Sequence, residues 1–378
     1  MSNISQCLCG VIPPHILRKI AGAADADASS TARATLQEMY LFAQQRERFL
    51  ISKDRYEQAP AVAKQRNVYD AQRHRSLPGK RVRSESDPQS TDVEVNEAFD
   101  GSGVTYDFFA DIFGRRSIDG SGMPINATVH YGKNFDNAMW NGSQMVYGDG
   151  DGKLFNRFTA SIDVIAHELT HGVTQFTAML EYSGQTGALN EHISDAFGIM
   201  VKQYALGQTA KQSDWLIGAG LFAAGVRGKA IRSMAAPGTA YDDPRLGHDP
   251  QPARMHDYVV TEDDGGGIHI NSGIPNHAFY LAAMALGGNT WDVLGKVWYA
   301  ALTEKTEADA RFRDFANDTV VAAGELFGSG GTVERAIAAA WSKVGLAVRS
   351  RFAAAPKWRR RPAPSRPQAS ERKKGEAS

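Results

Sequence analysis

The sequence predicts an α+β fold of two lobes, and three observations carry this prediction. Between residues 67 and 147, alternating apolar residues and turn signals favour strands, with one helix predicted over Val93–Phe113. After Tyr182 the spacing of apolar residues favours helices as far as about residue 348. Between the two regions, an apolar run leads into His167-Glu168-Leu169-Thr170-His171 and predicts a central helix.

Length and composition indicate a globular protein with a large core. The chain has 378 residues, of which 42% are hydrophobic, and its net charge is zero. That charge is unevenly spread, because residues 349–378 contain ten Lys or Arg and two Glu, about +8. The only cysteines, Cys7 and Cys9, are too close together to brace the body by a disulfide. No apolar run reaches the length of a membrane helix, and residues 1–10 lack the charged and apolar regions of a Sec signal, so we expect none.

Changes in composition predict four segments. They are a front unit at 1–60, a strand-rich lobe with the central helix at 61–181, a helical lobe at 182–348 and a disordered basic tail at 349–378. In the front unit, Pro13-Pro14 predicts a short extended stretch. Ser29-Ser30-Thr31 can cap a helix whose apolar residues are Leu36, Met39, Tyr40 and Phe49.

The central helix carries residues suited to bind a metal ion. His167 and His171 are four residues apart, so both imidazoles project from one face of a helix. Zinc accepts such nitrogen donors, and Glu191 downstream supplies a third ligand while one position stays open for water. Glu168 follows the first histidine and is placed to act as a general base.

Asp195 follows Glu191 by one helical turn, on the same face. A carboxylate there can accept the second N–H of a zinc-bound histidine and fix its tautomer. The alternative is an ordinary solvated helix acid.

A glycine-rich segment, Asp263–Gly273, contains a second candidate site. A flexible backbone can approach a reaction centre closely, and His269 can then donate to a developing oxyanion. A histidine between Ile268 and Ile270 is otherwise more often structural. A glycine-rich loop can also bind phosphate, but no Lys-Ser/Thr follows this one to support that function.

Six motifs in the same order resemble the thermolysin family of bacterial neutral metalloproteases. They are DNAMWNG, YGDGDG, HELTHGVTQ, GALNEHISDAFG, IRSM and DGGGIHINSG, and the resemblance covers about residues 67–348. It implies the thermolysin-like two-lobe fold and a zinc endopeptidase, a hydrolase, with one catalytic Zn²⁺ held by His167, His171 and Glu191. It also implies Glu168 as base, with His269, oriented by Asp264 and assisted by Tyr182, stabilising the oxyanion.

The same resemblance assigns residues that bind the substrate. Asn137 and Ala138 match the edge strand that binds the substrate backbone, and Arg232 matches the arginine that binds the residue after the cut. Positions matching the pocket for that residue are Phe155, Phe158, Val164 and Ile231. Because all four are apolar, we expect cleavage on the amino side of hydrophobic residues, with the two phenylalanines favouring medium-sized side chains.

The sequence departs from the larger family members at their paired calcium ions. Asp163 and Asp214 match calcium ligands, but Lys202, Leu216 and Ala219 fill other ligand positions. A lysine ammonium can neutralise two carboxylates without the oxygen ligands that calcium needs. We therefore expect the double calcium site to be absent. The Asp149/Asp151 turn lacks the glutamate of an EF-hand and reads as a hairpin turn.

The front unit resembles the short propeptide of the protealysin-like branch of this family. Its motif, Pro13, Pro14, Ile16 and Leu17, implies inhibition of the precursor, and we expect Ile16 or Leu17 to fill the apolar pocket. Removal of the unit is expected by a cut between about residues 50 and 66, which makes the protein an autoprocessed zymogen. Cys7 or Cys9 could instead cap the zinc, although free thiols are the simpler reading.

The expected partners are protein and peptide substrates and the protein's own propeptide, in a monomer that needs neither nucleic acid nor membrane. The tail and the basic residues Arg73–Arg75 and Lys80–Arg83 are read as solvated surface. Export by a non-classical route is expected, with a cytoplasmic location as the alternative. A zinc aminopeptidase and a non-catalytic homologue are the rival functions; the first lacks a recognisable anchor for a substrate amine, and the second would lack ligands or base.

Overall fold

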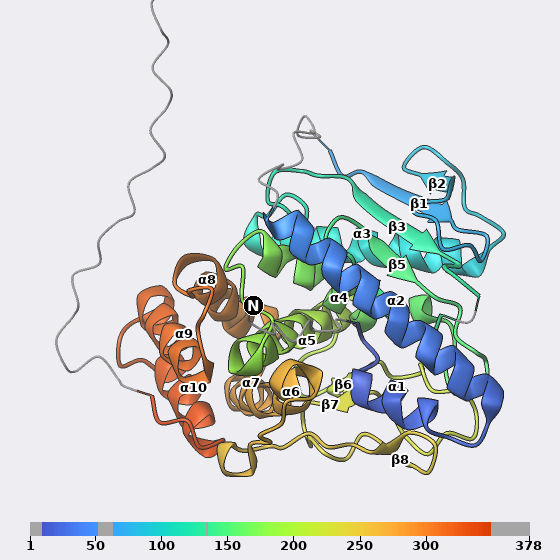
Figure 1. Ribbon diagram of the computed structural model, residues 1–378. Helices are drawn as coiled ribbons and strands as arrows, with labels where there is room; N and C mark the ends of the chain where they lie inside the picture. Colours follow the sequence, from blue (N-terminus) through green and yellow to red (C-terminus); the bar gives the residue numbers. More distant parts are fainter. Residues whose placement is uncertain (1–9, 52–62, 134, 349–378) are drawn as a thin grey trace, which may run out of the picture. The chain divides into compact units, whose positions relative to one another are not determined.

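The computed structural model of the protein describes residues 10–51, 63–133 and 135–348 (Figure 1). The helices are α1 Pro14–Ala21, α2 Ala26–Ile51, α3 Val93–Phe113, α4 Ile162–Gln175, α5 Gly184–Leu206, α6 Asp264–Asn271, α7 Gly273–Leu286, α8 Lys296–Glu304, α9 Phe312–Phe327 and α10 Thr332–Lys343. The strands are β1 Arg66–Asp70, β2 Lys80–Ser84, β3 Ile125–Val129, β4 Ala138–Trp140, β5 Met145–Tyr147, β6 Leu216–Ile217, β7 Arg232–Ser233, β8 Asp242–Asp243 and β9 Gly247–His248. Short helical turns occur at Phe158–Ala160, Met255–Asp257 and Trp291–Gly295.

The main sheet has the strand order β2-β1-β3-β5-β4. β1, β3 and β5 run parallel, and the two outer strands, β2 and β4, pair antiparallel with their neighbours. β4 is therefore an edge strand, and it contacts the central helix α4. An edge strand exposes backbone donors and acceptors that can pair with another extended chain.

Helix α3 begins and ends at the residues predicted for it, for identifiable reasons. Asp92 caps its first turn by accepting hydrogen bonds from two backbone N–H groups, and Gly114 ends it in the left-handed conformation. His130 lies between the Asp92 and Asp149 carboxylates, with 2.8 Å to each. These two carboxylates outweigh partial burial and raise the pKa of His130 to about 9. The resulting imidazolium ties the start of α3 to the turn after β5.

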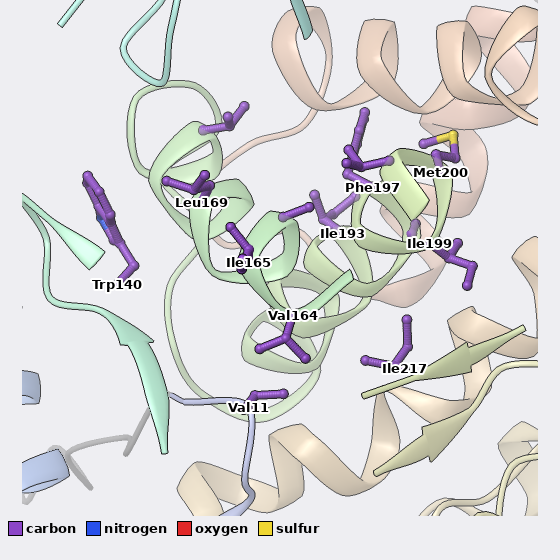
Figure 2. Packing of buried hydrophobic residues seen from close by; sticks show 14 of the residues in the cluster. Val11, Trp140, Val164, Ile165, Leu169, Ile193, Phe197, Ile199, Met200 and Ile217 are labelled. Carbon is purple, nitrogen blue, oxygen red and sulfur yellow. The ribbon is translucent and has the colours of Figure 1, made fainter. Parts of the chain in front are cut away.

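Helices α4 and α5 lie against each other at the centre of the protein (Figure 2). Their facing side chains, which include Ile165, Leu169, Ile193 and Phe197, are almost fully buried. At Gly198 the two backbones come so close that an added Cβ would lie 2.7 Å from the carbonyl oxygen of Asp163 and 3.4 Å from Cβ of His167. This close approach brings residues of α4 and α5 within reach of one common point.

The helical lobe packs around large aromatic residues. Trp298 of α8 and Trp341 of α10 are stacked with ring centroids 6.0 Å apart, and both are fully buried. His192 of α5 accepts a hydrogen bond from the Trp298 indole and contacts Asn276 through its other ring nitrogen. Burial lowers the pKa of His192 to about 4, so this ring is a neutral part of the core.

The front segment is helical where an extended stretch was predicted. Pro14 occupies the first turn of α1, where a missing N–H costs nothing and the fixed φ suits a helix. The predicted cap of the second helix is also wrong: Asp25 accepts from the N–H groups of Asp27 and Ala28, and α2 begins at Ala26. Ser29 lies inside the helix and donates to the carbonyl of Ala21. In Figure 1, α2 runs diagonally in front of α4 and α5.

The predicted α+β fold is confirmed, with a sheet-containing lobe before α4 and a helical lobe after it. The prediction missed the two small ladders β6–β7 and β8–β9, because strands of two residues leave no periodic pattern. Within the described part of the chain, no helix is long and apolar enough to cross a bilayer. The chain divides at Val348, and the predicted tail lies outside the described residues, as do Cys7 and Cys9.

The close contact of α4 and α5 gives a first prediction. We expect Gly198→Ala to lower the free energy of unfolding by about 1–3 kcal/mol, because the added methyl group must push one backbone from the other. Thermal unfolding followed by circular dichroism measures this effect. Gly22→Ala is the control, since its added Cβ would have no neighbour closer than 3.7 Å. Equal melting temperatures for Gly198→Ala and the wild type would contradict the prediction.

Candidate active site

Three predicted ligand atoms meet at one buried point. Nε2 of His167 lies 3.1 Å from Nε2 of His171, and each nitrogen lies 3.4 Å from an oxygen of Glu191. All three side chains are fully buried. The helical spacing places the two imidazoles on one face of α4, and α5 brings in the carboxylate.

This spacing fits a tetrahedral metal ion better than a hydrogen-bond network. Bonds of about 2.0–2.1 Å to a tetrahedral zinc ion separate the ligand atoms by about 3.3–3.4 Å. Oε2 of Glu191 is also buried without a hydrogen bond, which is costly unless a cation balances it. Two facing imidazole nitrogens and a carboxylate form a donor set of the kind that zinc prefers.

Both imidazoles are held from behind by polar side chains. Nδ1 of His167 lies 2.8 Å from Asp195, and Nδ1 of His171 lies 2.8 Å from the side-chain oxygen of Asn190. Such contacts fix the tautomer that leaves Nε2 free for a metal ion. Asp195 was predicted in this position. Asn190 was missed, although its place directly before Glu191 could have suggested it.

Asp195 also holds Arg232 of β7. The guanidinium donates two hydrogen bonds of 2.8 Å to the two carboxylate oxygens, and Asn276 of α7 donates a third. Burial alone would raise the pKa of Asp195, but Arg232 and His167 hold it well below its usual range. One buried carboxylate thus fixes a candidate metal ligand and a candidate substrate-binding residue together.

Glu168 lies beside the edge strand. Its Oε2 accepts a hydrogen bond of 3.0 Å from the backbone N–H of Trp140 in β4, and its side chain is fully buried. The carboxylate is therefore held between the candidate metal site and the strand.

His269 approaches the same point from α6. Asp264 accepts hydrogen bonds from its backbone N–H at 2.9 Å and from Nδ1 at 2.8 Å. Its Nε2 lies 3.5 Å from Glu191. Burial lowers the pKa of His269, but the carboxylates of Asp264 and Glu191 outweigh it and raise the pKa to about 9. The positive φ angles of Gly265, Gly266 and Gly267 allow this tight approach.

Tyr182 also contacts the candidate metal ligands. Its hydroxyl donates to Glu191 and lies 3.4 Å from both ring nitrogens of His171. The Arg46 guanidinium of α2 lies 4.9 Å from the centre of the Tyr182 ring. The second helix of the front segment therefore covers this side of the site.

The predicted pocket residues lie together in the core. Phe155 and Phe158, with ring centroids 5.9 Å apart, are fully buried, as is Val164, and Ile231 is 1% exposed. Ile231 precedes Arg232, so one predicted pocket residue and the candidate substrate-binding arginine share one segment.

The front segment contacts the candidate substrate-binding residues through its backbone. The Val11 N–H donates to the Ala138 carbonyl at 3.2 Å, and the Val11 carbonyl accepts from Arg232 at 3.2 Å. Asn137 bonds both the N–H and the carbonyl of Ile12, at 2.9 and 3.1 Å. In Figure 2, Val11 lies beneath Val164 among the buried side chains.

These contacts correct one prediction. Val11, rather than Ile16 or Leu17, reaches Arg232, and it is fully buried. Ile16 and Leu17 are buried on α1, because the chain turns into a helix directly after Pro13 and α1 packs against α2. Pro13 and Pro14 thus set the point at which the extended stretch ends.

Lys202 contacts the two acids, Asp163 and Asp214, that match calcium ligands in the sequence. Its Nζ lies 3.0 Å from both carboxylate oxygens of Asp214, 3.7 Å from Asp163 and 3.1 Å from the carbonyl of Leu216. The Ala219 carbonyl accepts a hydrogen bond from the Ser161 hydroxyl. One ammonium group therefore balances the two carboxylates.

Comparison with known proteins decides the family. Residues 36–175 match the thermolysin metallopeptidase catalytic domain, and residues 178–346 match its α-helical domain. The chain belongs to the thermolysin family. This metallopeptidase, a hydrolase of peptide bonds, is 50% identical over 353 residues to an extracellular metalloprotease of Pectobacterium carotovorum subsp. carotovorum, covering 92% of the chain and 99% of the relative.

Other relatives narrow the branch of the family. The metallopeptidase is 40% identical over 289 residues to a thermolysin of Alicyclobacillus acidocaldarius, covering 74% of this chain and 50% of that one. A solved structure, the precursor of protealysin from Serratia proteamaculans, superposes with a TM-score of 0.82 at 49% identity, covering 90% of this chain and all of that chain. The chain is therefore a protealysin-like member of the thermolysin family.

The shared role of Asp195 gives a prediction for the metallopeptidase. We expect Asp195→Asn to weaken zinc binding by about 10–100-fold, because the amide neither orients His167 as well nor balances Arg232. Competition with a chromophoric chelator measures the affinity. The matched control, Asp242→Asn, changes an exposed carboxylate and should leave the affinity as it is. Equal zinc affinities in Asp195→Asn and the wild type would refute the positioning role.

Proposed function

We propose that this metallopeptidase is a zinc endopeptidase, made as a precursor that processes itself and that its own front segment blocks. The convergence of His167, His171 and Glu191 beside Glu168 carries the proposal. A zinc ion bound there would lower the pKa of a water molecule to about 7 and polarise a carbonyl group.

The protein's own residues then have the following roles. Glu168, fixed by the Trp140 N–H, takes a proton from the attacking water and delivers it to the leaving amine. His269, held by Asp264, donates through Nε2 to the developing oxyanion, and the Tyr182 hydroxyl assists. A water molecule adds across the peptide bond, giving a carboxylate and an amine.

The front segment supports the proposed binding mode of substrates. Val11 lies where the residue after the cut would lie, since its carbonyl accepts from Arg232 and its N–H pairs with Ala138. The apolar pocket of Phe155, Phe158, Val164 and Ile231 fits cleavage on the amino side of hydrophobic residues. Val11 is medium-sized, which agrees with a preference for medium-sized side chains in a pocket narrowed by Phe155 and Phe158.

The same contacts support inhibition in the precursor. The Val11 N–H pairs with Ala138 of the edge strand, Ile12 bonds the Asn137 side chain and Arg46 lies against the Tyr182 ring, so the front segment occupies positions that a substrate would need. The segment in which the cut is predicted, residues 50–66, lies largely outside the described residues. The protein is proposed to act as a monomer.

Secretion is proposed from the relatives of this chain. Proteins of Pectobacterium carotovorum and Serratia marcescens that resemble it are named extracellular metalloproteases. Export by a non-classical route remains the prediction of the sequence, with a cytoplasmic location as its alternative.

The ion contacts of Lys202 support the proposal that this endopeptidase lacks the double calcium site. The ammonium group lies between Asp163 and Asp214 and accounts for their charge. Stability would then depend on this lysine rather than on dissolved calcium.

Glu168→Ala tests the proposed reaction. We expect the variant to bind zinc but to lose cleavage and self-processing by at least about a hundredfold, because no other group is placed to take the proton. Mass spectrometry of a peptide blocked at both ends measures cleavage and locates the cut; metal analysis measures bound zinc. Cleavage of the blocked peptide by the wild type excludes an aminopeptidase.

A time course of the wild type tests the inhibition. Activity should rise as the front segment is removed, and Glu168→Ala should stay intact throughout. Constant activity during processing would contradict the blocking role, and processing of Glu168→Ala by itself would contradict the role of the base.

A calcium chelator tests the role of Lys202. The wild type should keep its melting temperature with a calcium-selective chelator. In Lys202→Ala, the free energy of unfolding should fall by about 1–3 kcal/mol, because two carboxylates are left without a balancing charge. Lys211→Ala, at an exposed lysine, is the matched control. A sharp fall in the wild-type melting temperature under chelation would contradict the proposal that the double calcium site is absent.

A further inference from the structure

One histidine of the front segment lies near Arg232, His269 and Asp264 and has no part in the proposed chemistry. His15 is the second residue of α1, and its Nε2 lies 2.9 Å from the Tyr241 hydroxyl. Its Nδ1 is buried and has no hydrogen-bond partner. A charged ring would carry an N–H at Nδ1 as well, with no acceptor for it. The surroundings therefore favour a neutral imidazole.

The charges that face His15 are mostly positive. Arg232 of β7, His269 of α6 and Arg18 of α1 all disfavour a proton on its ring, and only Asp264 favours one. Asp264, however, already accepts two hydrogen bonds from His269. The N-terminal end of α1 adds the positive end of a helix dipole.

The partner of His15 does not titrate in the same range. Burial raises the pKa of the Tyr241 phenol far above neutrality, Asp249 adds to this shift and Arg232 opposes it. Tyr241 is thus an uncharged hydrogen-bond partner throughout. For His15 itself, burial is the main cause that lowers its pKa from 6.5 to about 4 in the docked segment.

We propose that His15 makes the front segment a pH-sensitive plug: protonation of its ring expels residues 10–21 from the cleft. This inference rests on the proposed blocking role and adds its regulation. A free histidine titrates near pH 6.5 and the docked one near 4, so docking has full strength above pH 6.5 and weakens as the pH falls toward 4. The equilibrium constant for docking of the front segment is expected to be about thirtyfold lower at pH 5 than at pH 7.5.

Hydrogen exchange of the backbone amides tests the proposal in the zinc-loaded full chain. A Glu168→Gln background prevents self-processing during the measurement. Protection of residues 10–21, corrected for intrinsic exchange, should fall about thirtyfold from pH 7.5 to pH 5 when His15 is present. In His15→Asn, which keeps a neutral polar group near Tyr241, it should change by less than about threefold.

His256→Asn is the matched control, because this histidine has a side chain 70% exposed and should leave the pH dependence as in the parent. Similar melting temperatures of the variants at pH 7.5 show that each is folded. Equal pH dependence with and without His15 would overturn the proposal, as would unchanged protection at pH 5 in the parent. Absence of peptide cleavage by the wild type would defeat the proposed function, while the exchange result would still report on docking alone.

Discussion

The buried carboxylate of Asp195 connects the parts of this protein that must act together. It contacts His167 on α4, accepts two hydrogen bonds from Arg232 on β7 and accepts a third from Asn276 on α7. A buried ion pair of this kind stabilises little by itself, but losing one partner leaves a charge without compensation. Its effect is therefore geometric: the proposed zinc ligand and the proposed substrate anchor cannot move independently.

The same geometry explains why a short segment can occupy the cleft. Val11 accepts from the arginine that Asp195 holds, and Ile12 pairs with Asn137 beside the edge strand. These contacts use the backbone of the front segment, so they place few demands on its own side chains. An extended substrate would bind in the same way. Side chains then fix the segment, with Glu38 of α2 accepting from the Tyr131 hydroxyl and paired with Arg75.

Charge balance is the second theme of the fold. Lys202 balances Asp163 and Asp214, His130 balances Asp92 and Asp149, and Arg232 balances Asp195. In each case a cationic side chain supplied by the chain itself neutralises one or two carboxylates. Where His167, His171 and Glu191 meet, His269 lies 3.5 Å from the Glu191 carboxylate, and the proposed zinc ion would add the positive charge that the three candidate ligands share.

The sequence by itself determined the fold class, the family and the residues that meet at the candidate metal site. Helical spacing places His167 and His171 on one face, and this local geometry needs no knowledge of the rest of the chain. Only the tertiary structure decided that Asn190 contacts His171 and that Asn276 donates to Asp195, because each contact joins side chains of two different helices. It also decided that Val11 rather than Ile16 meets Arg232: a hydrogen bond from a guanidinium to a backbone carbonyl 221 positions away leaves no local signal in the sequence.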